Sequence, residues 1–171
     1  MLHSQTGNGC YRLKPIQKKF EAAWGVSLSP TPGLTHSEIF DGIYNGTIKS
    51  LYLVGENPVL SEANASHAIA AMEKIDFLVV QDIFLTETAQ LADVVLPAAT
   101  FAEKNGTFSN TERRVQRVRQ AIAPVGEAKP DWQIVCAMAQ RMGVSGFDYS
   151  NPQEIMKEIS SLVPSYAGIT Y

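Results

Sequence analysis

Three short apolar segments, separated by stretches with helical spacing, constrain the fold of this 171-residue chain more than any other feature. They span residues 51–54, 77–80 and 94–96. Apolar runs of about four residues without polar alternation are typical of strands that are buried on both faces of a parallel sheet. Helices between such strands provide right-handed crossovers. The pattern therefore predicts an α/β fold with three α/β/α layers and a mostly parallel, Rossmann-like sheet.

Helices are expected before, between and after these strands. Apolar spacing predicts them over residues 15–24, 35–45, 62–74, 86–91, 131–142 and 152–162. Thr35, with Glu38 three residues later, forms a capping box for the second helix, and Asp131 is expected to cap the fifth. Residues 106–109 and 114–119 are expected to form a hairpin. Residues 1–14 show no periodicity and are expected to form an irregular leader.

These elements suggest a three-part organisation. Residues 35–146 are expected to form the α/β domain. Residues 1–34 are assigned to the leader and an N-terminal helix, and residues 147–171 to a C-terminal helix and a linker toward a missing domain.

Composition excludes several function classes. Hydrophobic residues make up 45% of the chain and charged residues 18%, which is the balance of a globular protein. The 14 lysines and arginines are outnumbered by 17 acidic residues, and the net charge of −3 argues against a nucleic-acid partner held by broad positive potential. No run of about 18 apolar residues occurs, so no membrane insertion is expected.

The chain lacks the common motifs of metal and nucleotide chemistry. Its two cysteines, Cys10 and Cys136, are far apart, and its three histidines are scattered. Cys136 lies in an apolar helical stretch and is expected to be a core residue. Neither a GxGxxG fingerprint nor a P-loop is present, and no nucleophile and base pattern is visible. No catalytic residue and no metal ligand is therefore assigned.

The unusual residues follow the predicted strands. Gly55-Glu56-Asn57 comes after the first strand, Gln81-Asp82 ends the second, and Lys104 lies beyond the third. Ligands of open α/β sheets bind at the carboxyl ends of the strands, where these segments should converge. Asp82 could accept hydrogen bonds from a guanine edge or ribose hydroxyls, and Lys104 could bind a phosphate. The same residue types also form turns and caps, and spacing alone leaves both interpretations open.

An arginine cluster is the strongest basic feature. Its members are Arg113, Arg114, Arg117 and Arg119, and they lie on the predicted hairpin. They could contact phosphates or an acidic partner, although a solvated β face is the commoner arrangement.

Several segments resemble the molybdopterin oxidoreductase family, and in particular the catalytic α subunits of NAD-dependent formate dehydrogenases. The segments are LYLVGENP (51–58), FLVVQDIFLTETAQLADVVLPAATFAEKNGTFSNTERRVQRV (77–118) and GEAKPDWQIVCAMAQRMG (126–143). Together they cover much of residues 36–143. No single piece is specific, but their combination in this order is.

The resemblance implies that the domain binds one of two molybdopterin guanine dinucleotide cofactors, which jointly hold molybdenum or tungsten. Residue-level matches identify Asn57, Gln81 and Asp82 as nucleotide contacts, with Asp82 directed to guanine. Lys104 and Asp131 match further cofactor-contacting positions. Weaker matches are Gly55, Glu56 and Thr107.

The resemblance also implies a larger parent enzyme. That parent would oxidise formate to carbon dioxide and pass electrons through [4Fe–4S] clusters toward NAD. The family's cluster-binding cysteines, metal-ligating cysteine or selenocysteine and catalytic histidine have no counterparts here. The chain is therefore expected to be an inactive fragment without bound cofactor. Its expected partners are the remaining domains of the parent and its electron-transfer subunits, and the expected location is cytoplasmic.

Two alternatives remain at this point. One is a structural domain of a related superfamily member, such as a nitrate reductase or the large iron–sulfur subunit of respiratory complex I, which can keep the fold without a molybdenum cofactor. The other is a stand-alone interaction module that docks through the arginine cluster.

Overall fold

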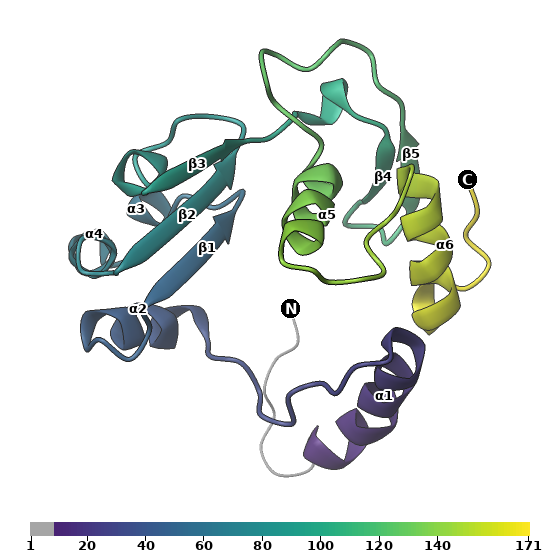
Figure 1. The fold of residues 1–171 in the computed structure, drawn as a ribbon, viewed down its shortest axis with the longest axis horizontal. Coiled ribbons are helices and arrows are strands. Elements are labelled where there is room, and N and C mark those ends of the chain that lie inside the picture. The colour runs from purple at the N-terminus through teal and green to yellow at the C-terminus, as the bar shows by residue number, and fades with distance from the viewer. Residues whose placement is uncertain (1–8) are drawn as a thin grey trace. The chain divides into compact units, whose positions relative to one another are not determined.

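The computed structural model describes residues 9–171, with side chains from residue 14 onward (Figure 1). Its helices are α1 (Gly9–Trp24), α2 (His36–Tyr44), α3 (Pro58–Ser61), α4 (Ala65–Met72), α5 (Asp131–Arg141) and α6 (Pro152–Leu162). Three short 3-10 turns are η1 (Ala89–Leu91), η2 (Phe101–Glu103) and η3 (Pro164–Tyr166). The strands are β1 (Ser50–Val54), β2 (Phe77–Asp82), β3 (Val94–Pro97), β4 (Gly106–Ser109) and β5 (Val115–Val118).

A parallel sheet forms the centre of the larger part of the chain. Its strand order is β1-β2-β3, and both strand pairs are parallel. Leu53 of β1 is in register with Val80 of β2, and Val80 with Val95 of β3. Figure 1 shows the three arrows pointing the same way. The predicted α/β fold with its parallel sheet is confirmed.

One face of the sheet carries the hydrophobic core. Leu78 and Val80 of β2 are fully buried, and Leu51 and Leu53 of β1 pack on the same side. The residues that cover them come from two helices and η1, and they are Phe40, Ile43, Ala68, Ala71, Met72 and Ala89. Helix α4 contributes its small alanines to this core and packs against α2. The core therefore uses the apolar residues on one face of β1 and β2.

The other face of the sheet meets the beginning of α5. Side chains alternate along a strand, so Tyr52 and Gln81 lie on the face opposite Leu78. Gln81 is fully buried and donates through Nε2 to Asp131 Oδ1 at 2.8 Å. The chain before α5 is attached to the end of β3, because the Lys129 carbonyl accepts from the Ala99 N–H at 2.9 Å.

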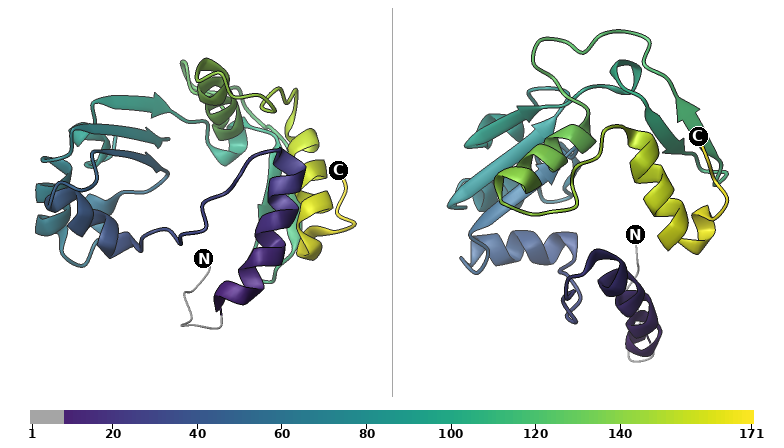
Figure 2. Two further views of the ribbon diagram at one scale, coloured as in Figure 1. Left: turned by 60° about the horizontal axis from the view of Figure 1, so that its bottom comes forward. Right: turned by 45° about the vertical axis from the view of Figure 1, so that its right-hand side comes forward.

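A separate two-stranded ribbon follows the sheet. β4 and β5 form an antiparallel pair (Figure 2). Phe108 is in register with Gln116. At the turn, the Arg114 N–H donates to Asn110 Oδ1 at 3.0 Å. Thus the hairpin that the sequence predicts is confirmed.

The predicted start of α2 is also confirmed. The Glu38 N–H donates to Thr35 Oγ1 at 3.4 Å, and the Thr35 N–H donates to Glu38 Oε2 at 2.7 Å. Hydrogen bonds from the backbone and side chain of Thr35 lower the pKa of Glu38. The last helix, α6, begins after Asn151, whose side chain accepts from the Glu154 N–H.

Several predicted boundaries are wrong. Residues 9–14 belong to α1 rather than to an irregular leader, and residues 1–8 lie outside the described part. The helix expected over 62–74 is the shorter α4, and the one-turn helix α3 before it was not predicted. Pro58 starts α3, and Asn64 then caps α4 by accepting from the His67 N–H at 3.2 Å. The helix expected from 86 is only the 3-10 turn η1.

The chain divides into two compact units. Gly33–Asp148 forms one, and the described part of Met1–Pro32 forms the other with Tyr149–Tyr171. Within the second unit, Trp24 Nε1 donates to Glu158 Oε1 at 2.8 Å. The sequence pattern assigns these two terminal segments to separate parts, residues 1–34 and 147–171. None of the helices in residues 9–171 has the length and apolar character needed to cross a bilayer.

Replacing Leu78 by alanine is expected to lower the free energy of unfolding by about 2–5 kcal/mol, because it leaves a cavity in the buried face of the sheet. The matched control is Leu60→Ala on α3, where 69% of the side chain is exposed. That change should cost less than about 0.5 kcal/mol. Urea denaturation measures the free energy of unfolding of both variants. Equal losses of stability would contradict the assignment of Leu78 to the hydrophobic core.

Candidate functional site

The carboxyl ends of the parallel strands bring together the segments that the sequence singled out. The Gly55 N–H donates to the Gln81 carbonyl at 2.9 Å, and the Ala98 N–H donates to the Asp82 carbonyl at 3.0 Å. Gly55 has a φ of +62°, in the left-handed region that glycine adopts without strain. The chain can therefore turn sharply from β1 into the segment that leads to α3.

A chain of hydrogen bonds connects β1, β2, α5 and the residue after η2. Tyr52 OH donates to Gln81 Oε1, Gln81 Nε2 donates to Asp131 Oδ1, and Lys104 Nζ donates to Asp131 Oδ2. An ionised carboxylate only accepts, so the amide nitrogen of Gln81 must face Asp131. Its oxygen is then directed to the Tyr52 hydroxyl. We call these four residues the edge network.

The edge network shifts the pKa of two of its members. Burial acts to raise the pKa of Asp131, but hydrogen bonds from Lys104 and Gln81 and the charge of Lys104 outweigh it, and the pKa is lowered. Burial, and then the charge of Asp131, raise the pKa of Tyr52. At neutral pH the network therefore holds an ionised aspartate against a protonated tyrosine and a cationic lysine.

The backbone just before Lys104 is anchored by the buried carboxylate of Glu103. Glu103 is 4% exposed, and its Oε2 accepts from the Thr100 N–H at 2.8 Å. Its Oε1 accepts from the Val125 N–H at 3.1 Å, which attaches the later loop to η2. A buried carboxylate is tolerated only when it is bonded in this way. The side chain of Lys104 itself is 19% exposed, so its ammonium group is largely enclosed in its pair with Asp131.

Asn57 faces the segment before η1. Its Oδ1 accepts from Thr88 Oγ1 at 2.6 Å and from the Thr88 N–H at 3.3 Å. Its Nδ2 donates to Glu87 Oε2 at 2.9 Å, and this bond lowers the pKa of Glu87. The Asn57 side chain thus joins the loop after β1 to the loop after β2.

Asp82 is held differently from its neighbours. Its Oδ1 accepts from the N–H groups of Ile83 at 2.7 Å and Phe84 at 3.2 Å. Within residues 9–171, its Oδ2 accepts no hydrogen bond. The carboxylate is therefore fixed in orientation by one oxygen, while the other is available to a donor from outside.

The remaining predicted residues lie apart from the edge network. Glu56 Oε1 accepts from Ser61 Oγ at 2.7 Å, so it stabilises α3. Thr107 lies on β4, in register with Arg117. That Glu56 and Thr107 contact a cofactor stays a prediction.

Sequence reasoning did not identify three residues that contact the predicted ones, namely Tyr52, Glu87 and Thr88. A tyrosine inside an otherwise aliphatic strand was the available signal for Tyr52, because a half-buried hydroxyl near a strand end needs a partner. No pattern in the sequence pairs Asn57 with Thr88, since that contact joins two loops.

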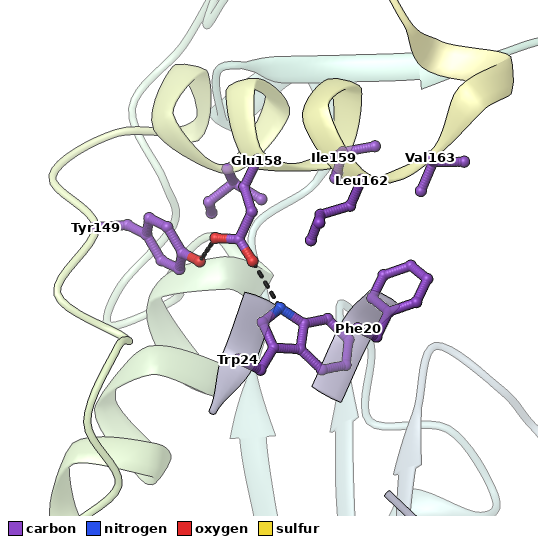
Figure 3. Close-up of a pocket in the computed structure, with 8 residues that line it drawn as sticks. Phe20, Trp24, Tyr149, Glu158, Ile159, Leu162 and Val163 are labelled. Carbon is purple, nitrogen blue, oxygen red and sulfur yellow. Dashed lines mark hydrogen bonds between the residues drawn. The ribbon is translucent and has the colours of Figure 1, made fainter. Parts of the chain in front are cut away.

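A hollow of about 110 Å³ lies in the unit that contains both terminal segments (Figure 3). It is lined by Phe20, Trp24, Tyr149, Ile155, Glu158, Ile159, Leu162 and Val163. The carboxylate of Glu158 accepts from both Trp24 Nε1 and Tyr149 OH. None of the predicted site residues lines this hollow. Among the described residues, no group of three or more His, Cys, Asp or Glu side chains could hold a metal ion.

Asp131→Asn is expected to lower stability at about pH 7 by about 1–2 kcal/mol, since it leaves the enclosed Lys104 without its counter-ion. Asp131 is 41% exposed, which keeps the loss moderate. Because the pKa of Asp131 is lowered on folding, its contribution is complete above the ordinary value of 3.8 and is lost as the pH falls below it. The difference between wild type and variant should therefore shrink progressively as the pH falls below 3.8.

The matched control for this prediction is Asp76→Asn. Asp76 pairs with Lys49 at 3.6 Å, and both side chains are about two-thirds exposed. This exposed pair should contribute little at any pH. Urea denaturation at several pH values measures both variants. A loss in Asp131→Asn that is independent of pH would contradict the assigned ion pair.

Comparison with known proteins identifies the family of this chain. Residues 4–141 match the family model "Molybdopterin oxidoreductase". A protein named "Putative formate dehydrogenase" from Staphylococcus haemolyticus is 53% identical over 156 residues, which is 91% of this chain and 16% of that protein. "Probable oxidoreductase YjgC" from Bacillus subtilis is 50% identical over the same shares of the two chains. The chain therefore spans about a sixth of the length of these relatives.

Among solved structures, the chain is similar to acetylene hydratase from Pelobacter acetylenicus. The TM-score is 0.65 at 24% identity, and the match covers 93% of this chain and 23% of the other. At this identity the similarity concerns the fold alone. The family match over most of the chain and the relatives at about half identity agree with it. The chain belongs to the molybdopterin oxidoreductase family.

Proposed function

We propose that this chain is the part of a formate dehydrogenase that binds one molybdopterin guanine dinucleotide. The parent enzyme would oxidise formate to carbon dioxide, with electrons leaving through [4Fe–4S] clusters toward NAD. The relatives at 53% and 49% identity that carry the name formate dehydrogenase support this substrate. The chain's own part would be to bind and orient the cofactor through the edge of its sheet.

The observation that carries the proposal is the hydrogen bonding of Asp82, which uses only one of its two carboxylate oxygens. Guanine presents two neighbouring N–H donors, N1–H and N2–H₂, and a carboxylate oxygen at a strand end is their natural acceptor. Asp82 Oδ2 is available for such donors, because only Oδ1 is used by the loop amides. The chemistry of this group fits the guanine end of the cofactor. When bound, the cofactor would supply the metal centre that exchanges electrons with the substrate.

The other predicted contacts fit a supporting role. Lys104 and Gln81 are both bonded to Asp131, and Asn57 is bonded to Thr88. These bonds hold the carboxyl edge in one arrangement, so that the cofactor would meet a preorganised surface. Under this proposal the remaining domains of the parent complete the site, and electron-transfer subunits accept the electrons in the cytoplasm. The metal would be molybdenum or tungsten.

One alternative has an observation in its favour. Because Lys104, Asp131 and Asn57 satisfy one another or their neighbours, the same residues could serve a purely structural domain of a related enzyme. The two functions differ in what they predict for Asp82, whose Oδ2 accepts no hydrogen bond within the described residues.

The proposal predicts that the 171-residue chain binds GDP and discriminates against ADP. Adenine presents an acceptor at N1 where guanine presents a donor, so only guanine pairs fully with a carboxylate. Titration of the isotope-labelled chain followed by NMR measures affinities as weak as millimolar, about −4 kcal/mol. Shifts at Asp82 with GDP and none with ADP are expected. No shift with either nucleotide in a folded sample would favour the structural domain.

Asp82→Asn is the sharpest variant for this test. The asparagine oxygen can still accept from the amides of Ile83 and Phe84, so the loop should keep its conformation. Its amide nitrogen would then stand where Oδ2 stands now, and a donor would face the donors of guanine. We expect GDP affinity to fall at least about tenfold. The control is Asp76→Asn, which changes the same group in an exposed pair and should leave GDP binding unchanged.

The same proposal predicts that this chain alone does not oxidise formate. It assigns neither a proton-transfer group nor a metal ligand to the chain, so an electron-accepting dye should stay oxidised when formate is added. A dye-reduction assay with the purified chain measures this. Turnover above the rate without protein would contradict the assignment of a cofactor-positioning role.

A further inference from the structure

A run of three exposed apolar side chains follows Asp82 directly. Ile83 is 46% exposed, Phe84 71% and Leu85 66%. Single apolar residues are common on protein surfaces, but consecutive large ones are costly to hydrate and mark a place where something binds. This run lies at the carboxyl end of β2, which is the ligand edge of an open α/β sheet.

The same hydrogen bonds fix both the carboxylate and the backbone that carries the ring. The Ile83 and Phe84 N–H groups donate to Asp82 Oδ1 at 2.7 and 3.2 Å. The backbone of Asp82 is itself held by the sheet, through the Ala98 N–H. An acceptor oxygen and an exposed aromatic side chain are thus only two residues apart on one anchored turn. We call residues 82–85 the edge turn.

Such a turn offers the two features by which proteins recognise a nucleobase. The carboxylate pairs with the donor edge of the base in its plane, and an aromatic ring can stack on its face. The Phe84 side chain is 71% exposed and can offer the face of its ring, whereas the residues of the edge network are polar and bonded to one another. The charge complementarity of Asp82 selects a base with two adjacent N–H donors. Guanine fits this description, and adenine does not.

We propose that Phe84 is a base-stacking residue, and that the edge turn binds a guanine base by its N–H edge at Asp82 and by its face at Phe84. This inference rests on the proposed function and adds a specificity-determining residue to it. Ile83 and Leu85 precede and follow Phe84 in the sequence, and under this proposal their exposed apolar side chains would help to exclude water from the base. Removing the ring should then weaken binding of any purine, while changing Asp82 should weaken binding of guanine selectively.

The test compares four forms of the 171-residue chain, namely wild type, Phe84→Ala, Phe84→Leu and Phe84→Tyr. GDP and IDP are titrated against each and followed by proton NMR. Stacking on an aromatic ring shields the base, so the H8 proton of bound GDP should shift upfield. The alanine variant should lose this shift and weaken GDP binding about 5- to 100-fold. The tyrosine variant keeps a ring and should restore both.

The leucine variant separates stacking from simple burial. It keeps an apolar side chain, so a stacking role predicts that the H8 shift disappears while part of the affinity remains. IDP lacks the N2 amino group and should bind more weakly than GDP in every form by a similar factor, because that loss belongs to Asp82.

The matched control is Phe77→Ala at the opposite end of the same strand. Phe77 is 47% exposed and is the first residue of β2. It should change neither the GDP affinity nor the H8 shift. Circular dichroism of each variant checks that the fold is kept.

The outcomes distinguish this inference from the proposed function. If wild type and Phe84→Ala bind GDP with equal affinity and equal H8 shift, the stacking role is wrong and the cofactor-binding function stands. If folded wild type binds neither GDP nor IDP, both proposals are wrong for this chain. Loss of affinity in Phe84→Ala with rescue in Phe84→Tyr supports the inference.

Discussion

The hydrogen-bonded side chain of Gln81 is the interaction on which the carboxyl edge of this domain depends. It is fully buried at the end of the central strand, where an unsatisfied amide would cost more than its bonds contribute. Tyr52 and Asp131 satisfy it from two different elements, and Lys104 satisfies the second oxygen of Asp131. Each residue of the edge network has a polar group whose hydrogen bond is provided by the next residue of the network. Strand β1, the start of α5 and the residue after η2 are therefore held in one arrangement.

This internal satisfaction divides the predicted site residues into two kinds. Asp131 accepts hydrogen bonds from both Gln81 and Lys104. The Asn57 side chain is hydrogen-bonded to Thr88 and Glu87. They give the edge its shape. Asp82 uses Oδ1 to fix its own turn, on which the exposed Phe84 lies two residues later, and no donor in the described residues bonds its Oδ2. A preorganised edge with one unused acceptor can select a ligand without a conformational change, since little has to be ordered on binding.

Much of the fold could be predicted from the sequence because it follows from local rules. The strands around Leu53, Val80 and Val95 are continuous apolar runs, and all three form one parallel sheet. The burial on both faces that such runs predict does not hold for β3, where Val94 and Val95 are exposed. The capping box of Thr35 and Glu38 starts α2 where the pattern predicts. The helix expected over 62–74 corresponds to α4, which is shorter and begins after its cap at Asn64. The preceding helix α3, which begins at Pro58, was not predicted because a single turn of four residues is too short to show helical periodicity.

The sequence by itself determined the α/β class, the positions of the three parallel strands along the chain and the positions where polar residues follow them. These follow from periodicity and from the single direction of parallel strands, which places all their carboxyl ends at one edge. Only the tertiary structure decided the partners of those polar residues. The bond from Gln81 to Asp131 joins residues 50 positions apart, and the bond from Asn57 to Thr88 joins residues 31 positions apart. A hydrogen bond depends on the distance and direction between two atoms in space, and neither is encoded in the residue types alone.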